Sequence, residues 1–306
     1  MDQKHLDDAT LPLVIRCVSF VFATLGNGFI VYLILKTRSI RKERLNYLIV
    51  LLAIGDIVIG ISAIAKVATT SIIRHNFTTR ICLASGALMI YGGHVTQLAM
   101  LLIAADRLHG IWNLHVINIQ RFNYVYILAI PVVLLVALIP VGVAFIGVEN
   151  KPLPICVMIL SWTYEYNIYM AFQMAFFNIS IPGEVPTSIR TIIISITVCY
   201  LVIIALYCRK VGNSGPASRN NFFAIIAGVA SVYIICWMIP KILAFVFNGK
   251  EFGELSQHMA VFGEYASAVL NFFVYGVAHK ELRKRMKNVF CRKPIIVAPA
   301  SAVTAY

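Results

Sequence analysis

The side chains that could do chemistry in this sequence are ionisable residues inside apolar runs. Asp56 lies near the middle of the run from Leu45 to Thr69, while Lys66, Lys241 and Glu264 also lie in apolar stretches. A charge in hydrocarbon is costly unless it is protonated, paired or hydrated, so each is a candidate functional residue. For Asp56 the alternative is a polar cluster that only joins helices. For Glu264 the alternative is that it only forms an ion pair with one of the lysines.

Patterns typical of catalysis are missing from the sequence. The seven histidines are scattered and show neither an HExxH motif nor another close ligand spacing. An intramembrane enzyme needs a nucleophile with its base or a metal cluster. We therefore expect that the protein is not an enzyme and needs no cofactor.

Apolar runs of membrane-spanning length must position these residues. Of the 306 residues, 60% are hydrophobic and 13% charged, and the mean hydropathy of +0.83 exceeds what a soluble core needs. We predict an all-α fold, a seven-transmembrane helix bundle that forms one domain over residues 1–306. The predicted spans are about 12–35, 45–69, 80–108, 122–146, 188–208, 221–247 and 256–278, followed by an amphipathic surface helix over 279–290.

The run from Cys82 to Arg107 distinguishes the two sides of the membrane. As a helix it separates these residues by about 37 Å, which is more than the bilayer's hydrocarbon core of about 30 Å. Cys82 can form a disulfide only in an oxidising compartment. Asp106 and Arg107, at the other end, need polar surroundings.

Positive charge indicates which end faces the cytoplasm. If the Arg107 end is inside, that side carries 17 of the 26 Lys and Arg residues against three acids. The N-terminus is then extracellular, and the net charge of +13 reflects membrane topology and contact with lipid, with no nucleic-acid partner. Two glycosylation sequons, at Asn76 and Asn178, lie on loops assigned to the outer side. These observations predict a multi-pass protein of the plasma membrane.

Cysteine positions agree with this orientation. Of the seven cysteines, Cys82 and Cys156 are the two assigned to the outer surface, so we predict a disulfide between them. Cys291 follows the basic amphipathic helix. It is interpreted equally well as a palmitoylation site or as an ordinary thiol.

Five groups of residues, in order along the chain, resemble motifs of rhodopsin-like (class A) G-protein-coupled receptors. They are Gly26-Asn27, Leu52-Ala53-Ile54-Gly55-Asp56, Cys82 with Asp106-Arg107, Cys236-Trp237 with Pro240, and Asn271-Phe272-Phe273-Val274-Tyr275. Within that class, the basic first loop and the triplet Asp106-Arg107-Leu108 look like nematode serpentine chemoreceptors of the SX class. The sequence departs from the usual pattern at Leu108 and Phe272, where tyrosine and proline are common.

This resemblance implies a receptor that binds a ligand on one side of the membrane and a G protein on the other. It would bind an extracellular ligand, a small molecule or peptide chemosignal, in the outer half and activate a heterotrimeric G protein at the inner face. Trp237 and Pro240 would mark the activation pivot in the sixth span, because a proline permits a kink. The residues implied for G-protein coupling and activation are Asp106, Arg107, Tyr200, Asn271 and Tyr275, with Tyr207 as the alternative to Tyr200.

The resemblance also implies an ion site. In receptors of this kind, a sodium ion and its waters are surrounded by residues that correspond here to Asn27, Asp56, Thr96, Ser267 and Asn271.

The expected ligand pocket carries a small excess of positive charge. Met89 stands where amine receptors of this class carry an aspartate, and Tyr265 stands where visual pigments carry the retinal lysine. A monoamine ligand and a light-sensing role are therefore disfavoured. Two lysines against one glutamate favour a neutral or acidic ligand. The predicted pocket residues are Lys66, Met89, Gly93, Trp237, Lys241 and Glu264.

A polytopic transporter or channel is the alternative function. A transporter would favour internal repeats and broken helices, and the two halves of the sequence show no convincing repeat. A channel would show a pore-lining ring or a filter motif, and none is apparent in the sequence.

Overall fold

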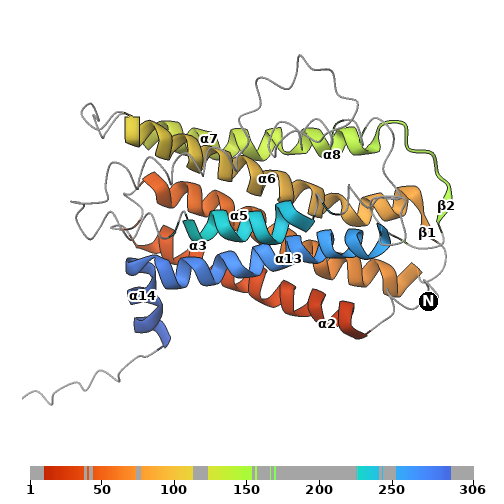
Figure 1. Cartoon of the computed structure of the whole chain (residues 1–306), viewed down its shortest axis with the longest axis horizontal. Coiled ribbons are helices and arrows are strands. Elements are labelled where there is room, and N and C mark those ends of the chain that lie inside the picture. Colours follow the sequence, from red (N-terminus) through yellow and green to blue (C-terminus); the bar gives the residue numbers. More distant parts are fainter. Residues whose placement is uncertain are drawn as a thin grey trace, which may run out of the picture.

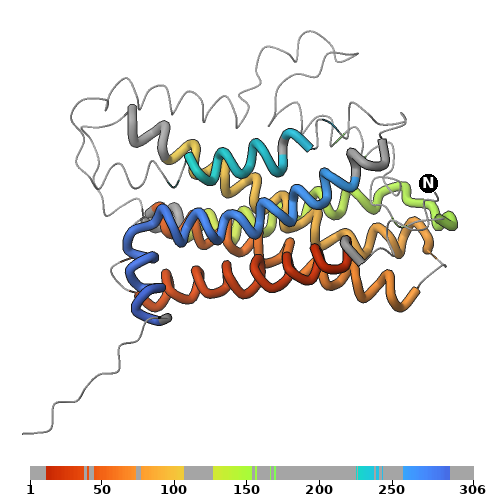
Figure 2. Tube along the Cα trace, turned by 60° about the horizontal axis from the view of Figure 1, so that its bottom comes forward, coloured from red at the N-terminus to blue at the C-terminus, as the bar shows by residue number. Residues whose placement is uncertain are grey.

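The computed structural model describes residues 10–37, 40, 44–73, 77–112, 123–153, 156, 166, 169, 225, 227–240, 243 and 253–290. Its long helices run side by side along the long axis of the molecule, as Figure 1 shows. A second view, in Figure 2, shows the same lengthwise arrangement.

The first three apolar runs form long helical rods. The first rod consists of α2 (Thr10–Ser19), the π-helical stretch η1 (Phe20–Gly26) and α3 (Asn27–Lys36). The next two are α5 (Arg44–Ile73) and α6 (Thr79–Trp112). Neither α5 nor α6 contains a proline, so no backbone donor is lost along them. Both helices extend four residues beyond the ends expected at 69 and 108.

The fourth rod is interrupted, although one continuous span over 122–146 was expected. It consists of α7 (Asn123–Val136) and α8 (Leu138–Phe145), separated by a turn at Ala137. Pro140 explains the interruption, because it has no N–H to donate to the carbonyl of Val136 and its ring crowds that carbonyl.

The remaining described helices are η3 (Tyr233–Met238), α13 (Gly253–Ala278) and α14 (Lys280–Phe290). η3 follows directly on helical residues 227–232, and the short apolar helix Ala227–Trp237 includes most of η3. α14 turns away from the end of α13 and crosses the direction of the bundle (Figure 1). The predicted fifth span, 188–208, lies outside the described residues, and the predicted sixth span is described only in part.

A short antiparallel ribbon closes one end of the bundle. β1 (Phe77–Thr78) pairs with β2 (Pro152–Leu153), with Phe77 opposite Leu153. These strands were not expected from the sequence. Their end of the molecule, opposite α14 in Figure 1, is called the disulfide end below.

Exposed and buried side chains are distributed as a bilayer requires. Five helices in the described part are long and apolar enough to cross a membrane. Leu25, Leu128 and Leu135 are at least 63% exposed, whereas Asn27 and Asp56 are fully buried. Such exposed leucines would be unfavourable in water, but lipid tails cover them in a membrane.

Close contact between α5 and α6 fixes the register of the two longest helices. A Cβ added to Gly92 would lie 2.9 Å from the carbonyl oxygen of Gly55 and 3.0 Å from the backbone nitrogen of Ile59. Because these are backbone atoms, they cannot move aside as a side chain could. Glycine at position 92 therefore lets the two backbones approach.

Candidate functional site

A disulfide anchors the chain at the disulfide end. Cys82, in the first turn of α6, bonds to Cys156 with an S–S distance of 2.11 Å and a Cα–Cα distance of 5.3 Å. Both residues are buried. The predicted pairing of these two cysteines is confirmed.

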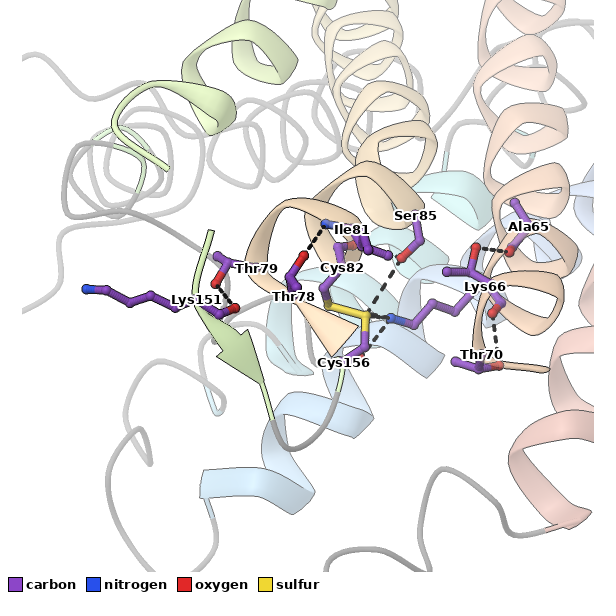
Figure 3. Close-up of a disulfide and its surroundings, with 11 residues drawn as sticks. Ala65, Lys66, Thr70, Thr78, Thr79, Ile81, Cys82, Ser85, Lys151 and Cys156 are labelled. Carbon is purple, nitrogen blue, oxygen red and sulfur yellow. Dashed lines mark hydrogen bonds between the residues drawn. A yellow bond between two sulfur atoms is a disulfide. The ribbon is translucent and has the colours of Figure 1, made fainter. Parts of the chain in front are cut away.

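Lys66 connects α5 to this disulfide. Its Nζ donates to the carbonyl oxygen of Cys156 at 2.8 Å and lies 2.6 Å from the Sγ of the same residue. Ser85 on α6 donates to the carbonyl oxygen of Cys82 at 2.7 Å. Figure 3 shows the Lys66 side chain extending from α5 toward the sulfur atoms. Lys66 thus holds Cys156 in place as well as bringing a positive charge to this end.

Beside this lysine is a cavity of about 40 Å³. Residues of α2, α5, α6 and α13 form its wall together with Cys156. The two fixed charges in the wall are both positive, on Arg16 and Lys66. The lining residues are Arg16, Ser62, Lys66, Ser85, Gly86, Met89, Cys156, His258, Val261 and Tyr265.

Arg16 and His258 are cavity residues that were not expected from the sequence, while Tyr265, at the position of the retinal lysine of visual pigments, lines the cavity as well. Arg16 is 5% exposed although it lies on the first apolar helix. An arginine inside an apolar run is itself a signal of function, because it must be buried in protein or reach the interface. That signal was present in the sequence, in the segment LPLVIRC.

Two of the residues expected in the ligand pocket line this cavity. Lys66 and Met89 line the cavity. Gly93 is buried one turn further along α6, and a Cβ added there would have no atom within 4 Å. Glu264 is 7% exposed and, like Arg16, lies within electrostatic reach of Tyr265. Lys241 lies outside the described residues.

A buried polar cluster occupies the middle of the bundle. The Nδ2 of Asn271 donates to the Oδ2 of Asp56 at 3.0 Å, and the Nδ2 of Asn27 donates to the carbonyl oxygen of Ala268 at 3.0 Å. Ser267 is also buried nearby on α13. The cluster therefore joins α3, α5 and α13.

Several oxygen atoms of this cluster lack a hydrogen-bond partner among the described protein atoms. They are Oδ1 of Asn27, Oδ1 of Asp56, Oγ1 of Thr96 and Oδ1 of Asn271. Buried oxygens without partners are costly and commonly bind water or a cation. A hard cation such as sodium prefers an all-oxygen environment of this kind. The residues present therefore fit the sodium ion that the resemblance implies, although the described part has no group of three or more His, Cys, Asp or Glu.

The helix that contains Trp237 has an unusual contact with α13. Pro240 offers no N–H to the carbonyl of Cys236 four residues earlier. Gly263 of α13 packs against that same carbonyl, because a Cβ at position 263 would collide with it. Trp237 is 2% exposed and stacks on Tyr233 with ring centroids 4.9 Å apart.

Comparison with known proteins identifies the family. The sequence profile described as "Serpentine type 7TM GPCR chemoreceptor Srsx" matches residues 20–290. The chain belongs to this family. It therefore has the seven-helix fold of a G-protein-coupled receptor and is not an enzyme.

Solved structures agree with the family at the level of the fold. The crystal structure of squid rhodopsin is similar with a TM-score of 0.67 and 18% sequence identity, covering 92% of this chain and 85% of that one. No curated protein sequence matches the chain. Both expected resemblances, to class A receptors and to serpentine chemoreceptors of the SX class, are confirmed.

At the α14 end of this Srsx receptor, the residues expected to act in coupling are only partly described. Asp106 lies on α6, and Tyr275 is fully buried on α13 four residues after Asn271. The side chain of Arg107 lies outside the described residues, as do Tyr200, Cys291 and the sequon residues Asn76 and Asn178. Their roles stay predictions.

Proposed function

We propose that this Srsx receptor binds an extracellular ligand in the cavity at its disulfide end and activates a heterotrimeric G protein at its α14 end. The observation that carries the proposal is the cavity, which lies between α2, α5, α6 and α13 and contains two positively charged side chains. Concave sites with a few convergent polar groups are where small ligands bind.

The orientation follows from the chemistry of the two ends. A disulfide persists in an oxidising compartment, so the end with Cys82 and Cys156 faces outside. α14 carries Arg283, Lys284 and Arg285 as exposed residues, and anionic lipid of the inner leaflet attracts such a helix. The N-terminus is then extracellular in the plasma membrane, where Asn76 and Asn178 can be glycosylated.

Activation requires a ligand that binds one arrangement of the helices more tightly than the other. The Trp237–Pro240 segment is the proposed pivot, because its proline frees the Cys236 carbonyl and Gly263 lets α13 approach there. Motion at this point would carry the inner part of the sixth span away from α6. Arg107, with Asp106, Tyr200, Asn271 and Tyr275, would then form the coupling surface.

The polar cluster supplies a second control point. We place a sodium ion with its waters at Asp56, next to the free oxygens of Asn27, Thr96 and Asn271. Ser267 is the further residue expected there. When bound, the ion supplies positive charge to the Asp56 carboxylate and joins helices whose separation changes on activation.

The test is a ligand screen in cells that express the full-length receptor, with G-protein dissociation as the readout. Extracts and chemosignal libraries should contain at least one agonist. Arg107→Ala should abolish its G-protein response while surface expression stays normal. Solute uptake or ligand-gated current that persists in Arg107→Ala would favour the transporter or channel alternative.

A further inference from the structure

The charges around the cavity determine what kind of ligand group can enter it. Arg16 and Lys66 are the two residues of fixed charge that line it, and no acidic residue of the described chain does so. A cavity wall that carries charge of one sign attracts a group of the opposite sign, because the low-dielectric wall concentrates the electric field.

Two neutral side chains of the wall, Ser62 and Ser85, already use their hydroxyl hydrogens within the protein. The hydroxyl of Ser62 donates to the carbonyl oxygen of Ile59 at 2.7 Å, and that of Ser85 donates to the carbonyl oxygen of Cys82 at 2.7 Å. Neither hydroxyl hydrogen is therefore available to donate to a ligand oxygen. The other polar residues of the wall are His258, Tyr265, Arg16 and Lys66. Of these, Arg16 and Lys66 form the stronger, charge-assisted hydrogen bonds to a ligand oxygen.

The size of the cavity and the apolar part of its wall also restrict the ligand. A cavity needs a volume of roughly 10–15 Å³ to hold one water molecule. The cavity here, of about 40 Å³, therefore holds about three waters or one acid group. Met89 and Val261 give the same wall an apolar part. These dimensions suit the end group of a ligand whose apolar body lies against these side chains.

We propose that the cavity binds the carboxylate of a small organic acid, with Arg16 and Lys66 as the anion-binding residues. This inference rests on the proposed function, because it identifies the chemical class of the receptor's ligand. An alkylamine is disfavoured, since no carboxylate lines the described cavity to receive it. Lys66 has a double role, because it also holds Cys156.

The experiment uses full-length receptor in nanodiscs of zwitterionic lipid, without G protein. Hexanoate, methyl hexanoate and hexylamine are compared at constant ionic strength by the rise in Tm. Hexanoate should stabilise the receptor in a saturable way, and the other two should not. Arg16→Gln and Lys66→Gln should each raise the half-saturating hexanoate concentration roughly tenfold or more, as expected for a lost charge-assisted bond.

Lys151→Gln is the matched control. It removes the same charge at the disulfide end from a side chain that is 72% exposed and paired with Glu149, so hexanoate binding should not change. If Arg16→Gln does not fold, Arg16→Lys keeps the charge and should retain binding, while Lys66→Gln still tests the site. Lack of saturable stabilisation by hexanoate, equal stabilisation by the methyl ester, or binding unaffected by both substitutions would overturn the proposal.

This measurement is independent of signalling. Binding that depends on Arg16 and Lys66 in a receptor that activates no G protein would support the anion site and contradict the proposed function. An agonist response to a compound without an acid group, unchanged in both variants, would support the proposed function and overturn the anion site.

Discussion

His279 and Asn46 are 233 residues apart in sequence and lie in hydrogen-bond contact, with the Nε2 of the histidine 3.0 Å from the Oδ1 of the asparagine. The backbone N–H of Leu282 donates to the Nδ1 of His279 at 3.3 Å, so Nδ1 is the acceptor and Nε2 carries the hydrogen. The Nδ2 of Asn46 donates to the carbonyl oxygen of Ile40 at 2.6 Å. One neutral imidazole therefore connects the start of α14 to α5, and through Asn46 to Ile40.

Acidification should loosen this junction. Burial lowers the pKa of His279 below its usual value of 6.5, and the nearby Glu281 opposes part of that effect. The folded state thus favours neutral imidazole, while the unfolded chain binds a proton more readily. The stabilisation is complete above pH 6.5 and is lost as the pH falls from there through the lower folded pKa. The Tm of purified receptor should fall between pH 7.5 and 5.5.

The His279→Gln variant should reduce this pH dependence, because glutamine does not titrate. His258→Gln, at the opposite end, is the control and should keep the wild-type fall in Tm. A pH dependence that is identical in wild type and His279→Gln would show that the junction does not titrate as described.

Adjacent glycines on α6 should respond oppositely to alanine. In Gly92→Ala the new methyl group meets backbone atoms of Gly55 and Ile59 at 2.9 and 3.0 Å, so α5 and α6 must separate. We expect a loss of about 1–3 kcal/mol. In Gly93→Ala nothing lies within 4 Å, and alanine should leave stability unchanged or raise it by about 0.5–1 kcal/mol. Thermal unfolding in one detergent measures the stability of both variants. Equal losses of stability in Gly92→Ala and Gly93→Ala would contradict the close contact between α5 and α6 at Gly92.

Removing the disulfide should weaken the folded receptor substantially. The bond joins residues 74 positions apart, and cross-links of this kind contribute about 2–4 kcal/mol. The Cys82→Ser, Cys156→Ser double variant should show a lower Tm, and non-reducing peptide mapping of wild type should recover the two cysteines joined. Cys17→Ser is the control, because Cys17 is free and exposed. Recovery of Cys82 and Cys156 as alkylated free thiols from folded receptor would refute the bond.

Sodium should stabilise the receptor through Asp56. Replacing choline by sodium at constant ionic strength should raise the Tm of wild type, because the ion would satisfy the free oxygens of Asp56, Thr96 and Asn271. Asp56→Asn should remove this response, since it removes the charge that holds the ion. Asp106→Asn, at the α14 end, should preserve the response. If wild type shows no difference between sodium and choline, the cluster holds only water.

Local sequence was sufficient for the long helices that the structure describes. Hydropathy over about 20 residues predicts a span without knowledge of its neighbours, which is why α5 and α6 lie where expected. The same local argument paired Cys82 with Cys156, because the remaining cysteines were assigned to spans or to the inner side. Interruption of the fourth rod at Ala137 was also encoded locally, in Pro140, but its effect was not predicted.

Contacts between helices could not be predicted from the sequence and became known only from the tertiary structure. Hydropathy does not specify the rotation or depth of a helix, and these depend on packing such as the contact between Gly55 and Gly92. Lys66 was therefore expected to pair with a glutamate or to contact a ligand. In the folded chain its Nζ donates a hydrogen bond to the carbonyl oxygen of Cys156. Arg16 joins Lys66 at one cavity, and His279 meets Asn46, because the helices that carry them are held together by residues far away in the sequence.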